Sequence, residues 1–402
     1  MVRKCSYKIL MLIENSPVPS DTRIWYEANL LRDHGFHVSV ICPKGSTYDQ
    51  EAYVCVEGIH IYRYQLPATT NTYVSYILEY TIGMFMTFLL SLKVWCLHGI
   101  DVIHATNPPD IFFLLGWFYR LFGKKFVFDQ RDLSPEMFQV KFKGGSKILH
   151  RLLLFLEWCS YQSAEVVITT NISQRRFAIG RGHYSPSRVF IVGNGPDLNR
   201  LKLVPLEHEP EKGWHFLLAY VGEMEVQDGV EYALYALHEL VHKRGRQDVS
   251  LVLIGDGSHA AALRALAHKL QLDAYINFTG WVSTKDVVHY LTMADIGLTP
   301  DPRNGLNEYC TMVKTMEYMA LGKPVVAFDL PETRISAQDG ALYATPNSAE
   351  DFASKIETLL DDEKLRLSMG AYGRKRIDDA LSWEHDKKNF LLVYKLLFPK
   401  SF

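Results

Sequence analysis

Cysteine is scarce in this chain, and no two of its six cysteines lie two residues apart. No group of cysteine and histidine has zinc-site spacing, so we expect no zinc module and no bound metal, only buried thiols in a reducing compartment. An excess of one charge is also missing, because the formal net charge is −2, which gives no reason to expect a nucleic-acid partner. The cysteines are Cys5, Cys42, Cys55, Cys96, Cys159 and Cys310.

Long uncharged apolar runs are missing too. The run near the N-terminus is short, basic on its N-terminal side and followed by a loop without a small-residue cleavage site, so we predict a first strand rather than a signal peptide. Residues 73–98 are unusually apolar, but their uncharged part, between Glu79 and Lys93, is shorter than the roughly 20 residues that span a bilayer.

Two readings of this apolar stretch remain open. It is either a buried core helix or an interfacial helix that rests on the membrane, in which case nearby lysines attract anionic lipids. The lysines concerned are Lys124, Lys125, Lys141, Lys143 and Lys147.

The length and the residue pattern indicate two α/β domains. The 402 residues are too many for one ordinary core, and 48% of them are hydrophobic. Short apolar runs alternate with amphipathic stretches, which predicts parallel, doubly wound sheets with helices between the strands. The expected strands are 8–13, 37–41, 101–104, 126–128, 165–169, 189–192, 216–221, 250–254, 275–278, 296–299 and 324–328.

The domain boundary is predicted where this alternation stops. Residues 196–213 are polar and aperiodic and contain proline, so we place a linker there. The domains are then residues 1–196, on the acceptor side, and residues 213–382. We expect a last helix, within residues 383–402, to pack back on the first domain.

An anion site is predicted in the second half, where a strand ends near Pro300. Ligands of doubly wound sheets bind outside the carboxyl ends of strands. A loop of roughly ten residues, longer than usual, leads to a helix predicted from Thr311 to Leu321. The free amides of Thr311, Met312 and Val313 at its positive end suit a diphosphate.

Two charged residues of this predicted helix extend the hypothesis. Lys314, in the first turn, opposes the helix dipole and therefore requires an anion nearby. Glu317 lies roughly 9 Å along the axis from the predicted helix start at Thr311 and leans back toward that start, where it could accept hydrogen bonds from a ribose diol. The alternative is a plain Lys314–Glu317 surface pair.

The segment KTMEYMALGKPVVAF resembles the donor-site signature of family 4 glycosyltransferases of the GT-B fold. The segments YVGEMEVQDGVEYAL, LVLIGDGSHAAALRALA, INFTGWV and VFIVGNGPD are similar to the same family, and so is the N-terminal stretch that begins MLIENSPVPSDTR, in the branch that acts in bacterial surface-polysaccharide assembly. The resemblance covers nearly the whole chain. It implies two Rossmann-like domains that face a central cleft.

The resemblance also implies an activity and roles for residues. The family transfers a sugar, with retention, from a nucleoside diphosphate sugar, without an essential metal. Glu317 would bind ribose, whereas Lys314 and the 311–313 amides would bind the diphosphate. The turn at Gly222 would face the phosphates, Asp256 would contact the donor, and the backbone near Val282 would contact the base.

The chain departs from the family pattern at several positions. Glu223 and Asp228 stand where many members carry an arginine and a lysine that clamp the diphosphate. The resemblance therefore implies that Lys314 and Arg303 supply more of the positive charge. Tyr309 stands where many members have an acidic residue, so the sugar-hydroxyl role passes to Asn307 and Glu308.

Three N-terminal loops are expected to face the cleft. The first carries Asp21, a helix cap or a site residue, and Arg23, a contact for phosphate or hydroxyl groups. The second begins at His104, which is either a core histidine or a site residue. The third carries Arg131, at the position of a family histidine, and Asp132; these two are either catalytic or a surface pair.

The resulting hypothesis is a cytoplasmic, retaining glycosyltransferase with a lipid-linked or membrane-proximal saccharide acceptor and a UDP- or GDP-sugar donor. It has no other cofactor. Because an oxocarbenium-like transition state needs positioning and cations, we expect no covalent carboxylate nucleophile. A nucleotide-sugar epimerase, a phosphorylase and a non-catalytic nucleotide-binding subunit are the alternatives. The first two lack support, since neither a compact acid/base set nor a sufficiently long chain with a pyridoxal lysine is evident.

Overall fold

A computed structural model describes residues 7–45, 48–67, 72–142, 145–201 and 215–399. The chain divides into two compact units, residues 1–193 with 387–402, and residues 194–386. The division falls three residues before the predicted boundary at 196. Residues 196–201 of the predicted linker belong to the second unit, whereas residues 202–213, Cys5 and Lys143 lie outside the described residues.

The first unit contains an eight-stranded sheet of order β3-β4-β2-β1-β5-β6-β7-β8. All neighbouring pairs are parallel except β3 and β4. The strand order changes direction between β1 and β5, so the loops that follow these two strands diverge at the carboxyl edge. The strands are β1 (Lys8–Leu12), β2 (His37–Pro43), β3 (Tyr53–Val56), β4 (Ile59–Tyr64), β5 (Val102–Thr106), β6 (Lys125–Gln130), β7 (Val166–Thr169) and β8 (Val189–Ile191).

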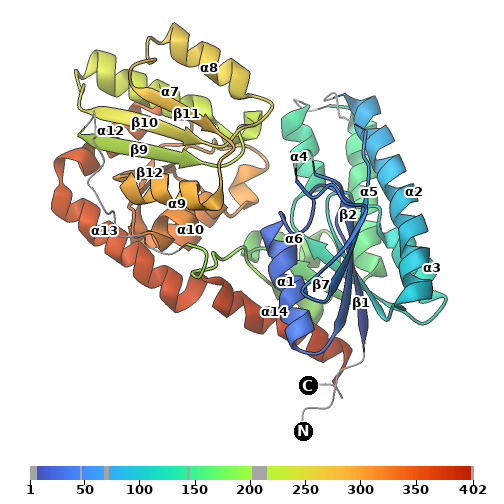
Figure 1. The fold of residues 1–402 in the computed structure, drawn as a ribbon. Coiled ribbons are helices and arrows are strands. Elements are labelled where there is room, and N and C mark those ends of the chain that lie inside the picture. Colours follow the sequence, from blue (N-terminus) through green and yellow to red (C-terminus); the bar gives the residue numbers. More distant parts are fainter. Residues whose placement is uncertain (1–6, 46–47, 68–71, 143–144, 202–214, 400–402) are drawn as a thin grey trace. The chain divides into compact units, whose positions relative to one another are not determined.

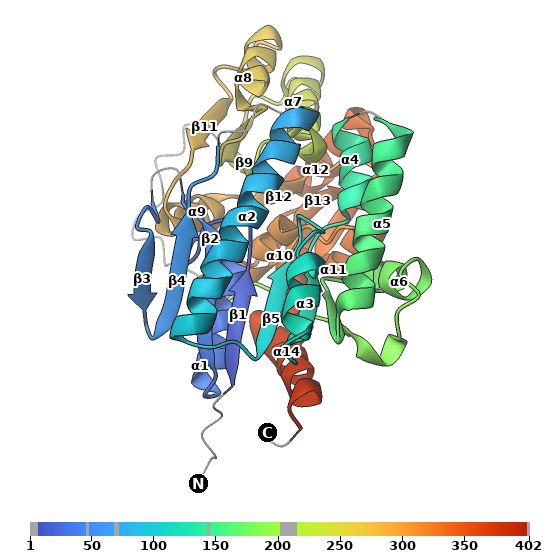
Figure 2. The same cartoon turned by 90° about the vertical axis from the view of Figure 1, so that its right-hand side faces the viewer.

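Helices cover both faces of this sheet, as Figure 2 shows for α2, α3 and α5 on one of them. Alternate residues of each strand face opposite ways. Leu10 and Ile103 pack toward α2, α3 and α5, whereas His104 faces α14, where it meets Tyr394. The helices are α1 (Thr22–Asp33), α2 (Tyr73–Leu97), α3 (Phe113–Arg120), α4 (Ser134–Lys141), α5 (Lys147–Ser163), α6 (Ile172–Gly180) and α14 (Trp383–Leu397).

Helix α2 is longer than its uncharged run suggested. The described residues contain one helix that is long enough and apolar enough to cross a membrane, judged by length and composition alone. It is Val74–Leu97, with a mean hydropathy of 1.5. By length and composition alone the whole helix therefore passes a threshold that its uncharged part does not, because the flanking residues extend it. One side of α2 is buried, including Thr87, Ser91 and Val94, and 22% of its apolar window is buried.

The outer side of α2 does not fit the prediction of a fully buried core helix. It exposes apolar side chains at helical spacing, and so do α3 and α5, the other helices on this face. A buried core helix would not leave such a surface. The exposed apolar residues are Val74, Ile77, Leu78, Phe85, Leu89 and Leu97 of α2, Leu114 and Trp117 of α3, and Ile148, Leu152, Phe155 and Trp158 of α5.

The second unit contains a six-stranded parallel sheet of order β11-β10-β9-β12-β13-β14. Its order changes direction between β9 and β12. The strands are β9 (Phe216–Val221), β10 (Val249–Ile254), β11 (Ile276–Gly280), β12 (Ile296–Thr299), β13 (Val325–Phe328) and β14 (Ala341–Ala344).

Two apolar cores flank this sheet. Leu218 and Tyr220 of β9 pack with α7, α8 and α12, which lie together in Figure 1, whereas Ala219 and Val221 pack with α9 and α10. The helices are α7 (Val230–His238), α8 (Ala260–Lys269), α9 (Thr284–Met293), α10 (Val313–Ala320), α11 (Pro331–Ala337), α12 (Ala349–Asp361) and α13 (Glu363–Arg376).

Two parallel-sheet α/β units agree with the expected fold class, and the expected strands lie within one to two residues of observed ones. Three further strands, β3, β4 and β14, were not predicted. Exposed and partly buried residues alternate in β3, which differs from the continuously buried run typical of a central parallel strand. The expectation of buried thiols was wrong for Cys55 and Cys96, which are exposed.

Candidate functional site

The carboxyl edge of the second unit's sheet opens between β9 and β12. Gly222 follows β9 with a φ of 145°, a conformation that side chains rarely adopt. A Cβ atom on Gly222 would lie 3.4 Å from Cε of Lys314, and one on Gly255 would lie 2.1 Å from the Gly222 carbonyl oxygen. These two glycines therefore let the loops after β9 and β10 approach each other closely at the predicted phosphate end.

Lys314 is buried at this edge and paired with two carboxylates. Its Nζ lies 2.7 Å from Oδ1 of Asp301 and 3.6 Å from Oδ1 of Asp228. Burial alone would lower the pKa of Lys314, but Asp301, Tyr220 and Asp228 raise it well above its ordinary value. The anion that Lys314 requires is therefore supplied by the protein, and the alternative Lys314–Glu317 surface pair is replaced by a buried pair with Asp301.

Asp228 is the weaker partner of Lys314. Burial raises its pKa to about 6, although Lys314 opposes this rise. Asp228 also accepts a hydrogen bond from the amide of Glu225. The charge around Lys314 therefore changes near neutral pH.

Helix α10 begins two residues later than predicted. Val313 is its first residue, so Thr311 precedes the helix and Met312 is the N-cap residue. Met312 makes no side-chain hydrogen bond to the first turn, because its thioether cannot replace a serine or aspartate cap. The prediction that Thr311 and Met312 lie within the helix was wrong. The positive end of the helix, now at Val313, still has no side-chain cap from Met312.

Glu317 lies on α10, one turn beyond Val313, and is partly buried. Burial raises the pKa of its carboxyl, whereas Arg200 and Lys314 oppose this rise. Arg200 is exposed and donates a hydrogen bond to Oγ1 of Thr284, 3.2 Å away. Sequence reasoning missed Arg200, although it closely follows the VFIVGNGPD segment.

Several polar side chains of the loop between β12 and α10 form hydrogen bonds and ion pairs with other protein groups, mostly within the same loop. Nδ2 of Asn307, which is buried, donates to the carbonyl oxygens of Gln227 at 2.9 Å and Pro302 at 3.0 Å. Nε of Arg303 lies 3.3 Å from Oε1 of Glu308. The NH₂ group of Asn307 is therefore bound within the protein, while its role as a sugar contact stays a prediction, and Arg303 and Glu308 offset each other's charge.

Two other predicted donor residues lie at the same edge. Asp256 follows β10, and its side chain accepts a hydrogen bond from the amide of Gly257 at 2.9 Å. Val282 follows β11 and is partly buried against the core on the α9 and α10 side. Gly222, Asp256, Val282 and Asp301 thus follow four neighbouring strands of one sheet.

In the first unit, the predicted acceptor-side residues form ion pairs. Oδ1 of Asp21 accepts from the amide of Ile24 as the N-cap of α1, so the cap reading is confirmed. Its Oδ2 accepts from Nη1 of Arg131 at 2.9 Å. The Arg131–Asp132 surface pair was therefore wrong. Burial raises the pKa of Asp132.

Arg23 is committed to the interior. Its guanidinium donates to the carbonyl oxygens of Val192 and Gly193, and lies 2.9 Å from Asp129 and 3.1 Å from Glu27. A strand-end aspartate and a helix glutamate therefore already bind Arg23, and its contact with a phosphate or hydroxyl group stays a prediction.

His104 lies beside this network and matches the core reading. It is fully buried, and its Nδ1 is 2.8 Å from the hydroxyl of Tyr394. Its Nε2 lies 3.7 Å from Asp129 and 3.8 Å from Glu27. Within the described residues these three side chains have the spacing of a metal site, but the cation beside both carboxylates is Arg23. In this structure the His104 side chain is closed off from solvent.

Asn107 is a second residue that sequence reasoning missed. Its Oδ1 accepts from the amides of Arg131 at 2.6 Å and Asp132 at 3.1 Å, and its Nδ2 donates to Oδ1 of Asp110. It thereby joins the loops after β5 and β6. Its place in a polar, proline-containing loop directly after a strand was the available signal.

Two family models together match most of the chain. "Glycosyl transferase 4-like domain" matches residues 21–195, and "Glycosyl transferases group 1" matches residues 215–362. The chain belongs to the family 4 glycosyltransferases of the GT-B fold. A sucrose-phosphate synthase from Thermosynechococcus elongatus has the same fold, with a TM-score of 0.77, 17% identity, and coverage of 98% of this chain and 99% of that chain.

Two curated relatives are similar over shorter stretches. The D-inositol 3-phosphate glycosyltransferase of Corynebacterium aurimucosum is 27% identical over 52% of this family 4 chain and 51% of its own length. The GDP-mannose-dependent monoacylated alpha-(1-6)-phosphatidylinositol monomannoside mannosyltransferase of Corynebacterium glutamicum is 30% identical over 35% of this chain and 37% of its own length. The matches thus span about half or less of these relatives.

Proposed function

We propose that this protein transfers a sugar, with retention of configuration, from a nucleoside diphosphate sugar to a lipid-linked or membrane-proximal saccharide. The observation that carries the proposal is the uncapped start of α10 beside Gly222, with Glu317 one turn further along. A diphosphate at the helix start would receive backbone amides, and the ribose would meet the Glu317 carboxylate. The GDP-mannose dependence of one relative supports a nucleotide-sugar donor.

Positive charge for the leaving diphosphate is the demanding part of this site. Lys314 is offset by Asp301 and Asp228, and Arg303 by Glu308. Arg200, which acts electrostatically on Glu317, is an exposed cation in the same unit. We therefore add Arg200 to the donor site, where helix amides and Arg200 would stabilise the departing charge. The nucleotide sugar is a co-substrate, and no resident cofactor or metal is part of the proposal.

A lipid-linked acceptor is inferred from the apolar face of the first unit. The exposed side chains of α2, α3 and α5 form an apolar surface of the kind that marks protein or membrane interaction sites. The phosphatidylinositol acceptor in the name of one relative supports a lipid-linked acceptor. We propose that this face rests on the cytoplasmic side of a membrane.

A donor-hydrolysis assay across UDP- and GDP-sugars, with and without membrane extract as acceptor source, tests the proposal. Turnover that increases with extract is expected. The buried pairing of Lys314 favours one rival, a nucleotide-binding subunit without catalysis. Nucleotide binding without any turnover would replace the proposed function by this rival.

A further inference from the structure

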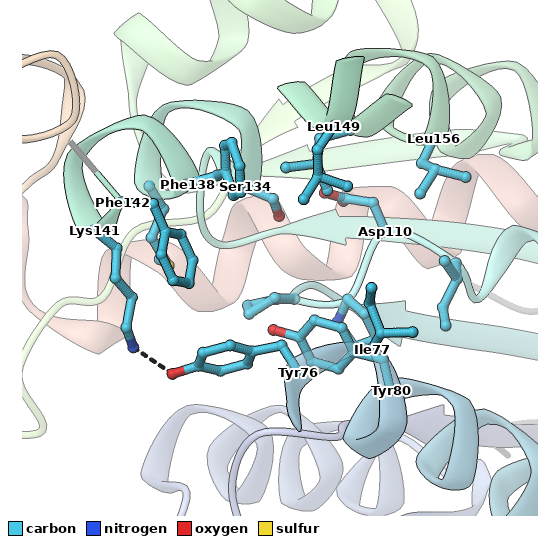
Figure 3. Close-up of a pocket in the computed structure, with 15 residues that line it drawn as sticks. Tyr76, Ile77, Tyr80, Asp110, Ser134, Phe138, Lys141, Phe142, Leu149 and Leu156 are labelled. Carbon is cyan, nitrogen blue, oxygen red and sulfur yellow. Dashed lines mark hydrogen bonds between the residues drawn. The ribbon is translucent and has the colours of Figure 1, made fainter. Parts of the chain in front are cut away.

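A mainly apolar cavity of about 170 Å³ lies in the first unit, among α2, α4, α5 and the loop after β5. Figure 3 shows aromatic and aliphatic side chains that point into it from all three helices. Apolar cavities of roughly 150 Å³ accept a benzene molecule, so this one has room for about one isoprene unit or a short stretch of alkyl chain. Residues that form its walls include Ile77, Tyr80, Phe138, Phe142, Leu153 and Leu156.

The polar residues that line this cavity include Tyr80, Asp110, Ser134 and Lys141. Pro108, Pro109 and Asp110 contribute the loop after β5, which is the loop at the point where the strand order reverses. Oδ1 of Asp110 accepts from Asn107 at 3.0 Å, and burial raises the Asp110 pKa to about 6. A saccharide in the cavity would leave hydroxyl groups unpaired against carbon, so the walls favour hydrocarbon.

A cation lies at the rim. Lys141 is exposed, donates a hydrogen bond to the hydroxyl of Tyr76, and lies 4.8 Å from the centre of that ring (Figure 3). The ammonium group therefore lies beside an apolar space, which is the arrangement that a phosphate attached to a hydrocarbon chain requires.

The exposed surface of α5 continues this chemistry outward. Ile148, Leu152 and Phe155 follow one another at helical spacing, with Lys147 and Arg151 beside them. The acidic residue of α5, Glu157, is buried and binds Arg181 at 2.7 Å. An apolar stripe flanked by cations complements the surface of an anionic bilayer, where a lipid phosphate and its chain occur together.

We propose that the cavity binds a stretch of the hydrocarbon chain of a phosphate-bearing lipid acceptor, with Lys141 near the phosphate. This inference rests on the proposed function, because it assigns a binding site to the acceptor of that reaction. The cavity lies at the carboxyl edge of the first sheet, so a bound hydrocarbon chain would lie next to the loops that were predicted to face the cleft.

Soluble probes separate this site from membrane attachment. Binding of farnesyl phosphate, dodecyl phosphate and inorganic phosphate is measured by calorimetry on the full chain. Both hydrocarbon phosphates are expected to bind at least about tenfold more tightly than inorganic phosphate, since each buried methylene adds affinity. The ratio between the two distinguishes an isoprenoid from an alkyl chain, and either one as the tighter ligand supports the site.

A variant that fills the cavity provides the decisive comparison. Leu153→Trp is expected to lower the affinity for both hydrocarbon phosphates about tenfold or more. The matched control is Leu392→Trp on α14, an exposed position of the same unit, and it leaves the affinity unchanged. Thermal melting checks that both variants fold, and Leu153→Phe replaces the tryptophan variant if that one does not.

The outcomes separate this site from the function on which it rests. Equal affinity in wild type and the filled variant, or no binding of either hydrocarbon phosphate, overturns the inference. Donor turnover onto membrane extract without such binding would overturn the inference and leave the proposed function standing. If the wild type binds the hydrocarbon phosphates and the filled variant does not, but no sugar donor is turned over, the cavity site stands and the proposed function is removed.

Discussion

Lys314 donates a hydrogen bond to Oδ1 of Asp301 across 2.7 Å, and Asp301 is itself buried. This pair occupies the edge where the strand order of the second unit reverses. A buried lysine with an aspartate partner carries little net charge toward a ligand. The number of protons on the neighbouring Asp228 therefore decides how attractive this edge is to a diphosphate.

The affinity for UDP-glucose is expected to rise several-fold as the pH falls from 7.5 to 5.5. Asp228, with a pKa raised to about 6, takes up a proton in this interval, so Lys314 is then offset by Asp301 alone. The diphosphate diester of UDP-glucose keeps its own charge. Calorimetry at several pH values measures the effect, and Asp228→Asn should bind tightly at both ends with little pH dependence. A slope that survives in Asp228→Asn would contradict this account.

Replacing Glu317 tests the ribose contact. Glu317→Ala should lower the affinity for UDP or GDP by about 1.5–3 kcal/mol, the range for hydrogen bonds to a charged group. Glu363→Ala, at an exposed position at the start of α13, is the control and should bind like the wild type. Unchanged nucleotide binding in Glu317→Ala would remove the central claim about the donor site.

Tyr394→Phe should affect stability rather than donor binding. The substitution leaves the buried Nδ1 of His104 without its partner, which costs about 1–3 kcal/mol of unfolding free energy. Urea unfolding measures the loss, and the exposed hydrogen bond removed by Tyr372→Phe is the control. A changed affinity for UDP-glucose in Tyr394→Phe would show that His104 acts in the site.

The stability of the first unit should fall as the pH rises from about 4.5 to about 8. Burial raises the pKa of Glu14 from 4.5 to about 8, so in this window the unfolded carboxyl ionises while the folded one keeps its proton. The stabilising contribution is complete below the lower value and lost above the upper one. Glu14→Gln should therefore be more stable than wild type at pH 9 and similar at pH 4.5 in denaturant titrations. An equal difference at both pH values would refute the assignment.

The apolar face should bind anionic vesicles. Phe155→Glu is expected to lower co-sedimentation with vesicles that contain phosphatidylglycerol about tenfold, because it replaces an exposed aromatic ring by a charge. Leu392→Glu, an equally simple change on α14, should sediment like the wild type. No binding of the wild-type protein to such vesicles would sink the membrane part of the proposed function.

The periodic parts of the fold were readable from the sequence. The strand Phe216–Val221 was predicted with the bounds that the structure gives it, and the last helix, expected within residues 383–402, is Trp383–Leu397. Both contrast with their flanks, through a short apolar run in one case and a helical period in the other. The order of strands in each sheet was not predicted, because pairing depends on contacts between residues far apart in the chain.

The candidate site was predicted unevenly for the same reason. Asp21 was read as a cap because capping is local, and the structure confirms it. Arg23 and Asn307 were read as ligand contacts, since nothing in the local sequence reveals that Asp129 or the Gln227 carbonyl lies next to them.

The sequence alone determined that this chain alternates strands and helices in two stretches, and that a helix with Lys314 and Glu317 follows a strand end in the second. These features depend on residue type and on spacing along the chain. The tertiary structure alone decided which charges meet. It paired Lys314 with Asp301, placed the hydroxyl of Tyr394 within hydrogen-bond distance of His104, and formed an apolar cavity among three helices. Folding does this because it brings together groups that lie far apart in the sequence.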